Sequence, residues 1–160
     1  MEDAESKVCG IVKQLNQNGK GIPERISDIK NFPAVDYNHF LEGINCDMLR
    51  LSKFSFQYES TIFNLISTSE EKFQMKFSLF VEYIGPVISI VLAVYYSWWF
   101  MLLAPILFFC GLKIGKNAYL STIFRSATSS EIEFCFLYFC KQISVYAKIQ
   151  DSVYYWGIED

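Results

Sequence analysis

The chain has 160 residues and a net charge of −3, and 52% of its residues are hydrophobic while 19% are charged. Ordinary soluble domains carry roughly 25% charged residues, so this composition predicts a small domain joined to a membrane element. The charge balance excludes nucleic acid as a partner, because no segment offers the basic surface that phosphate binding requires.

The cysteines predict a reducing compartment. They are odd in number and scattered, which is unlike a disulfide framework: Cys9, Cys46, Cys110, Cys135 and Cys140. The N-terminus begins with the acidic stretch Met1-Glu2-Asp3, where a signal peptide would be basic. Membrane targeting is therefore expected to come from an internal segment.

Residues 1–70 are predicted to form an N-terminal cytoplasmic helical region. Four apolar residues at helical spacing predict a first helix: Val8, Ile11, Val12 and Leu15. The pair Asn18-Gly19 is expected to end it. A short second helix is predicted over Pro23–Lys30, with proline in its first turn, and a turn is expected over Asn31–Val35.

A longer helix is predicted after Asp36, which is suited to cap it. Apolar or aromatic residues then recur with a helical period as far as Leu65. Residues 49–58 also alternate as a strand would, so both structures stay open there, with helix favoured. The stretch Ser67–Glu71 places a polar residue before two acids, which predicts the start of the next helix.

Residues 71–126 are predicted to form a membrane helical hairpin. No charged residue occurs from Tyr83 to Leu112, and as one straight helix this run would be about 45 Å long. A hydrocarbon core of about 30 Å would then require a tilt of about 48°, beyond the observed range of roughly 0–40°. A chain reversal at Ser97-Trp98 removes this misfit.

The reversal also explains why four aromatic residues lie in the middle of the run: Tyr95, Tyr96, Trp98 and Trp99. Tyrosine and tryptophan favour bilayer interfaces, so a turn near 95–99 predicts a membrane-interface tip. The Leu, Ile, Val and Phe residues between positions 84 and 112 favour insertion by roughly 5 to 9 kcal/mol. The alternative is a buried helix pair of a soluble protein.

Lysines flank the run on both sides, at Lys72, Lys76, Lys113 and Lys116, while the tip carries no charge. This pattern predicts a membrane location with both termini cytoplasmic. Glu82 and Lys113 lie equally far from the expected turn centre. They are therefore predicted to form an ion pair across the hairpin, with a pore-lining Glu82 as the functional alternative.

Gly85 and Gly111 lie nearly opposite each other, which predicts close packing of the two arms. Pro105 lies inside the second arm, where it is expected to free the carbonyl of Met101 and kink the helix. The strictly uncharged part of each arm would be only about 18–20 Å long. The depth therefore stays open between a full crossing, which is favoured, and entry into one leaflet.

Residues 127–160 are predicted to form a C-terminal amphipathic helix and tail. A break over residues 127–130 precedes it, and Ser130 with Glu133 matches a capping box. Polar residues share one face of this helix as far as Asp151, and large apolar residues share the other. The helix is expected either on the membrane surface or against the N-terminal helices.

The sequence contains no motif typical of an enzyme or a cofactor site, so no catalytic residue, cofactor or metal site is predicted. His39 is the only histidine, and it lies near Asp36 and Glu42. A single histidine beside two carboxylates is more typical of a helix surface than of an acid–base pair or a metal site.

The expected fold is mainly α: a helical membrane hairpin flanked by cytoplasmic amphipathic helices. The first function hypothesis is a non-enzymatic integral membrane protein that self-associates through its hairpin, as a membrane scaffold or a membrane-permeabilising effector. Its N-terminal region would sense a signal or bind a protein partner. The alternatives are a membrane-anchored regulatory subunit of a larger complex and a small membrane enzyme using His39.

Overall fold

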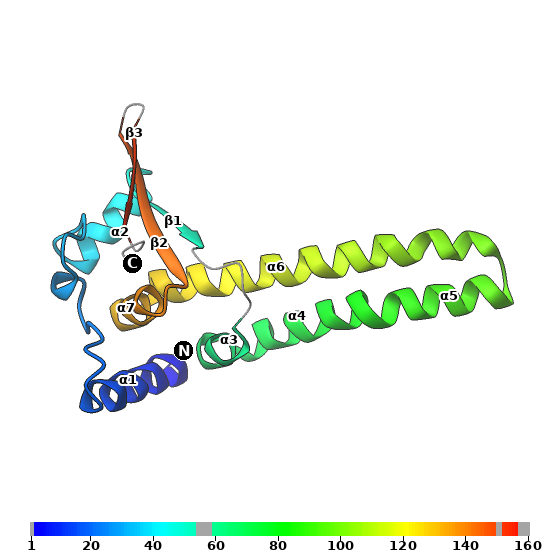
Figure 1. Ribbon diagram of the computed structural model, residues 1–160, viewed down its shortest axis with the longest axis horizontal. Helices are drawn as coiled ribbons and strands as arrows, with labels where there is room; N and C mark the ends of the chain where they lie inside the picture. Colours follow the sequence, from blue (N-terminus) through cyan, green and yellow to red (C-terminus); the bar gives the residue numbers. More distant parts are fainter. Residues whose placement is uncertain (1, 54–58, 150–151, 157–160) are drawn as a thin grey trace. The chain divides into compact units, whose positions relative to one another are not determined.

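The computed structural model describes residues 2–53, 59–149 and 152–156, and the chain is mainly helical, as predicted (Figure 1). The chain forms two compact units. The first combines both ends of the sequence, Met1–Ile66 and Ile123–Asp160, and the second is the central segment Ser67–Thr122. In sequence, the second unit is therefore an insertion into the first.

The first unit begins with helix α1, Glu2–Gln17, which confirms the predicted first helix and its end. Val8 and Val12, one turn apart, are fully buried. Gly19 follows the helix with φ of 78°, a left-handed conformation that only glycine adopts readily. The buried face of α1 packs on helices α3 (Ser60–Ile66) and α7 (Glu131–Phe139).

The predicted helix over Pro23–Lys30 is wrong in length, because only Ile26–Asp28 form a short 3₁₀ turn, η1. The backbone around this turn is bonded to distant groups. The N–H of Ile22 donates to Oδ1 of Asn16 at 2.6 Å, and the N–H of Ile26 donates to Oε1 of Glu131 at 2.8 Å. The Glu131 carboxylate thus takes the N–H of Ile26, which a helix would have paired with its own backbone.

Helix α2, Tyr37–Asn45, begins as predicted: the carboxylate of Asp36 accepts a hydrogen bond from the N–H of His39 at 2.8 Å. The predicted continuation of this helix is wrong over residues 46–53, whereas Ser60–Ile66 form a separate helix, α3. The side chain of Leu49 folds back over Gly43, where an added Cβ would lie 2.8 Å from it. The N–H of Leu49 also donates to the carbonyl of Gly43.

Strand β1, Arg50–Lys53, follows that fold-back, so the favoured helix over residues 49–58 is wrong where the structure describes it. Residues 54–58 lie outside the described part of the chain. The strand exists because it pairs antiparallel with strand β2, Ile143–Ile149, with Leu51 opposite Val145. Such a distant partner is not visible in a local sequence pattern.

The predicted C-terminal amphipathic helix is wrong beyond Phe139. Helix α7 ends at Phe139, and the chain continues as β2 and then β3, Ser152–Trp156. The three strands form one antiparallel sheet in the order β1-β2-β3. Lys141, with φ of 53°, turns the chain between α7 and the sheet. The local period over 130–151 was compatible with a helix, and the pairing on both sides of β2 overrides it.

The core of the first unit is built from apolar side chains of its helices and of β2. The largest fully buried ones are Ile26, Phe40, Phe63, Ile66, Ile123, Phe134, Leu137, Ile143 and Val145. The rings of Phe40 and Phe134 lie 4.5 Å apart between centroids. Burying one such aromatic side chain contributes about 1.5–3 kcal/mol to folding, so the unit has a core of its own.

Polar side chains inside this core are paired. The hydroxyl of Ser126 donates to the carboxylate of Glu133, and both side chains are buried. The predicted capping box at Ser130 is therefore wrong: the Glu133 carboxylate faces the core, and the hydroxyl of Ser130 donates to Oε1 of Glu5 at 3.0 Å. A buried carboxylate is tolerated only where donors replace its water.

The second unit consists of two helical arms. The first arm runs through helix α4 (Ser69–Leu79), a single π-turn η2 (Phe80–Ile84) and helix α5 (Gly85–Tyr95). The second arm runs through a 3₁₀ turn η3 (Trp98–Leu102) into helix α6 (Leu103–Ser129), whose last turns belong to the first unit. Thr68 and Glu71 form a capping box at the start of α4, which confirms the predicted helix start.

Candidate functional site

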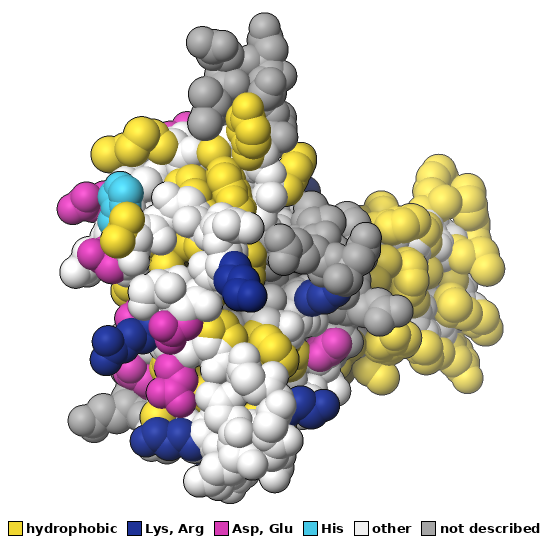
Figure 2. All heavy atoms as spheres, turned by 60° about the vertical axis from the view of Figure 1, so that its left-hand side comes forward, with side chains coloured by type: hydrophobic (Ala, Val, Ile, Leu, Met, Phe, Trp, Pro, Cys, Tyr) yellow, Lys and Arg dark blue, Asp and Glu magenta, His cyan; other side chains and the backbone are white. Residues whose placement is uncertain are grey.

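The two arms expose their apolar side chains. Within the described residues, Ser69–Tyr95 and Trp98–Ser129 are the two helical stretches that are long and apolar enough to cross a membrane. Only 11% and 6% of their most apolar windows are buried. Figure 2 shows hydrophobic side chains covering the visible face of these arms. A helix in the core of a soluble protein would be mostly buried.

The four aromatic residues expected at the tip lie at the reversal. Helix α5 ends at Tyr95, and η3 begins at Trp98. The rings of Trp98 and Trp99 stack with centroids 4.2 Å apart, and all four aromatic side chains are more than 60% exposed. An amphipathic ring that is exposed at the end of an apolar hairpin is suited to a bilayer interface.

The arms lie side by side and meet along a helix seam. A Cβ added to Gly111 would lie 2.5 Å from the backbone nitrogen of Glu82, so the two backbones touch at this point. Towards the tip, a Cβ on Gly85 would lie 3.3 Å from Leu107. Both glycines therefore lie where the arms approach closely, but they do not face each other: Gly85 meets Leu107, and Gly111 meets Glu82.

Residues missed by the sequence reasoning extend this seam. Gly115 meets Ser78, whose hydroxyl would lie 2.8 Å from an added Cβ. Ser78 and Ser89 are buried between the arms, at 1% and 3% exposure. The signal was present as the spacing Gly111-x-x-x-Gly115, a pattern that allows two helices to approach closely.

The seam contacts define the register of the hairpin. Glu82 with Gly111, and Ser78 with Gly115, are both symmetrical about a centre between Tyr96 and Ser97. The predicted centre lay one residue later. Because the register differs, Glu82 faces Gly111 and is not level with Lys113.

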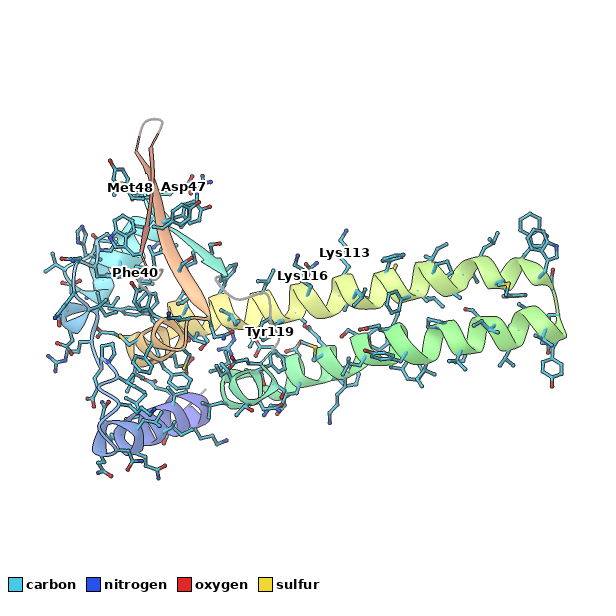
Figure 3. The ribbon with its side chains drawn as sticks, in the orientation of Figure 1. Phe40, Asp47, Met48, Lys113, Lys116 and Tyr119 are labelled. Carbon is cyan, nitrogen blue, oxygen red and sulfur yellow. The ribbon has the colours of Figure 1, made fainter. Side chains whose placement is uncertain are left out.

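No ion pair joins Glu82 to Lys113 in the part of the chain that the structure describes. Lys113 follows Gly111 by two positions, which turns it about 200° around the helix. It therefore lies on the face opposite the seam, and Figure 3 shows Lys113 and Lys116 pointing away from the first arm. The pore-lining role of Glu82 stays a prediction.

The two prolines of the hairpin lie near helix starts. Pro105 is the third residue of α6, where its missing N–H removes no α-helical hydrogen bond. The second arm changes from 3₁₀ to α-helix at Leu103, two residues before Pro105, and the kink stays a prediction. In the first arm, Pro86 is the second residue of α5, which begins where the π-turn ends. Its missing N–H denies the carbonyl of Glu82 an α-helical partner.

The remaining candidates give no site of their own. His39 is exposed on α2, and the nearby carboxylate of Asp36 caps the helix. Among the described residues, no group of three His, Cys, Asp or Glu side chains could hold a metal ion. The five cysteines are free thiols. Burial raises the pKa of the Cys135 thiol to about 12 and that of Cys140 to about 11, so both are poor nucleophiles.

Comparison of the chain with known protein families, with curated proteins and with solved structures found no match.

Proposed function

We propose that this chain is a non-enzymatic integral membrane protein whose hairpin crosses the bilayer with its aromatic tip at the far interface. The apolar, exposed surface of the two arms supports this proposal. Side chains such as Phe73, Val94 and Phe109 are 66–78% exposed. In water each would leave a large apolar area solvated, at a cost of about 25 cal/mol per Å², whereas lipid removes that cost.

The sheet of the first unit supports a topology in which both ends of the hairpin lie on the same side of the membrane. Strand β1 precedes the hairpin in sequence and β2 follows it, yet the two pair residue by residue from Arg50–Tyr146 to Lys53–Ile143. Helix α1 likewise packs on α7. Segments that fold together lie on one side of a membrane, which supports entry into and exit from the bilayer on the same side. The flanking lysines favour the cytoplasm as that side.

The length of the arms supports a full crossing over entry into one leaflet. Lys76 lies twenty residues before Tyr96, and Lys116 lies nineteen after Ser97. At 1.5 Å per residue, both distances are about 30 Å, which equals the thickness of a hydrocarbon core. Glu82 would then lie about 9 Å inside the lysine level, which makes its carboxylate the costliest group of the hairpin.

The proposed activity is self-association in the bilayer, as a scaffold or a permeabilising assembly. The seam glycines are covered within one chain, so copies would meet through the outer faces of the arms. The first unit has a core of its own and exposes apolar side chains such as Val35 and Met48. A membrane anchor alone would need neither feature. The first unit is therefore the part proposed to sense a signal or bind a partner.

Two measurements test the topology. A cysteine introduced at Ser97, in a variant whose exposed Cys46 and Cys110 are serine, should resist an impermeant thiol reagent added from the cytoplasmic side. Protease added on that side should cleave within 1–53. If the cysteine at position 97 is labelled from the cytoplasmic side, and protease on that side also cleaves within 1–53, the proposal that the hairpin crosses the bilayer is refuted.

Size and leakage measurements test the activity. A homo-oligomer in detergent that releases dye from liposomes supports the permeabilising assembly, and one that binds liposomes without leakage supports the scaffold. A monomer that is stable only with another protein would favour the regulatory subunit. Glu82→Gln should change ion leakage if Glu82 lines a pore. His39→Ala should leave all of these readouts unchanged, and a loss of activity in a folded variant would favour an enzyme.

A further inference from the structure

Three exposed lysines form a band around the open end of the hairpin: Lys76, Lys113 and Lys116. We name it the lysine collar. We propose that the lysine collar binds the phosphate groups of anionic phospholipids in the leaflet nearest the first unit. This inference rests on the proposed membrane insertion and adds the class of lipid that the hairpin selects.

The seam register brings the collar to one depth. Since Ser78 meets Gly115, Lys76 and Lys116 lie within about one residue of the same level on the two arms, and Lys113 lies about one turn nearer the tip. Lysine stems are long enough to carry their ammonium groups outward by such a distance. All three charges can therefore reach one plane of headgroups.

The collar faces outward. Lys76 and Lys113 are each two positions from a seam residue, about 200° around their helices, and Figure 3 shows Lys113 and Lys116 turned away from the first arm. Their neighbours on the surface are large apolar side chains such as Phe77 and Leu112, at 50% and 42% exposure. Ammonium groups beside lipid-facing apolar side chains match the boundary between headgroups and hydrocarbon.

Among the described residues, no acidic side chain forms an ion pair with the collar. No acidic residue occurs in 73–81 or in 111–130. A lysine at the membrane surface that lacks a carboxylate partner is attracted to anionic headgroups, and lipid phosphate is the occupant that complements this charge.

The test uses the full chain, reconstituted in phosphatidylcholine containing a minor share of phosphatidylglycerol. The protein is then extracted in mild detergent, and its retained lipids are counted by mass spectrometry. The wild type should retain phosphatidylglycerol above its share in the mixture, by about fivefold for each lysine that contacts a headgroup. Raising the salt concentration should reduce the enrichment.

Three variants complete the test. Replacement of the collar, Lys76→Gln with Lys113→Gln and Lys116→Gln, should reduce the enrichment to the level of the mixture. The matched control replaces three exposed lysines of the first unit by glutamine and should retain it: Lys13, Lys20 and Lys30. Arginine at the three collar positions should also retain it, because the charge is kept.

The outcomes separate the two proposals. Insertion into vesicles without enrichment, or equal enrichment in the wild type and the glutamine variant of the collar, would overturn the lipid site and leave the membrane hairpin standing. Failure of the wild type to associate with vesicles of either composition would overturn the proposed function and the lipid site with it.

Discussion

Replacement of Gly111 by alanine should separate the two arms of the hairpin. The added Cβ would lie 2.5 Å from the backbone nitrogen of Glu82 and 2.6 Å from its Cα. Backbone atoms cannot rotate away, so ordinary contact at 3.4 Å requires the helices to move apart by about 0.9 Å. At Gly85 the same change meets side-chain atoms of Leu107 at 3.3 Å and requires almost no movement.

Gly85→Ala is therefore the matched control, and the difference between the two variants gives the cost of the clash. Both changes gain helix propensity, up to about 1 kcal/mol. Overpacking typically costs about 1–3 kcal/mol, and a gap of 0.5–1 Å forfeits a quarter to a half of each neighbouring contact energy. We expect Gly111→Ala to be less stable than Gly85→Ala by about 1–3 kcal/mol.

The assay is a titration with SDS in mixed micelles, followed by energy transfer between fluorophores on the two arms. Gln74 and Asn117 are exposed positions at nearby levels, and cysteines there, in a variant whose Cys46 and Cys110 are serine, would carry the dyes. Gly111→Ala should lower the SDS fraction at which the arms separate. Equal midpoints for the two alanine variants would refute the backbone contact at the seam.

Three further predictions concern the first unit. Ser126→Ala should lower its unfolding free energy by about 1–3 kcal/mol, because buried Glu133 loses a donor; an unchanged melting temperature would contradict this. Burial, and then the nearby Glu133 carboxylate, raises the pKa of Tyr37. The folded state therefore keeps a proton that the unfolded state loses near pH 10, so the contribution of Tyr37 to stability should be level below about pH 10 and fall above it. The alkaline fall in stability should therefore be weaker in Tyr37→Phe. Finally, mass spectrometry after alkylation near neutral pH should find exposed Cys46 modified and buried Cys135 unmodified until the protein unfolds.

Local patterns were sufficient to predict the starts of α2 and α4 and the extent of the apolar region. The caps at Asp36 and Thr68 were correct because a cap depends on residues within one turn of it. The two long apolar helices and the reversal between Tyr95 and Trp98 follow from composition and length, which the sequence contains in full.

The sequence predicted that the two arms pack closely, but it did not predict which residues face each other across the seam. Glycines near the middle of each arm indicated a close approach, but Glu82 was expected opposite Lys113 and instead lies against Gly111. The turn centre is one residue earlier than expected, and a shift of one residue in a turn changes every pairing along an antiparallel helix pair. Only packing of the two arms selects between such registers.

The sequence alone determined where apolar residues are concentrated and where α2 and α4 begin, because both depend on side-chain chemistry over a few neighbouring positions. Tertiary structure decided the rest of the first unit. Residues 143–149 have the period of an amphipathic helix, yet they form the central strand of a sheet whose partner β1 precedes the hairpin. Strand formation depends on hydrogen bonds to neighbouring strands: β3 follows β2 directly in the chain, whereas β1 is about ninety residues away.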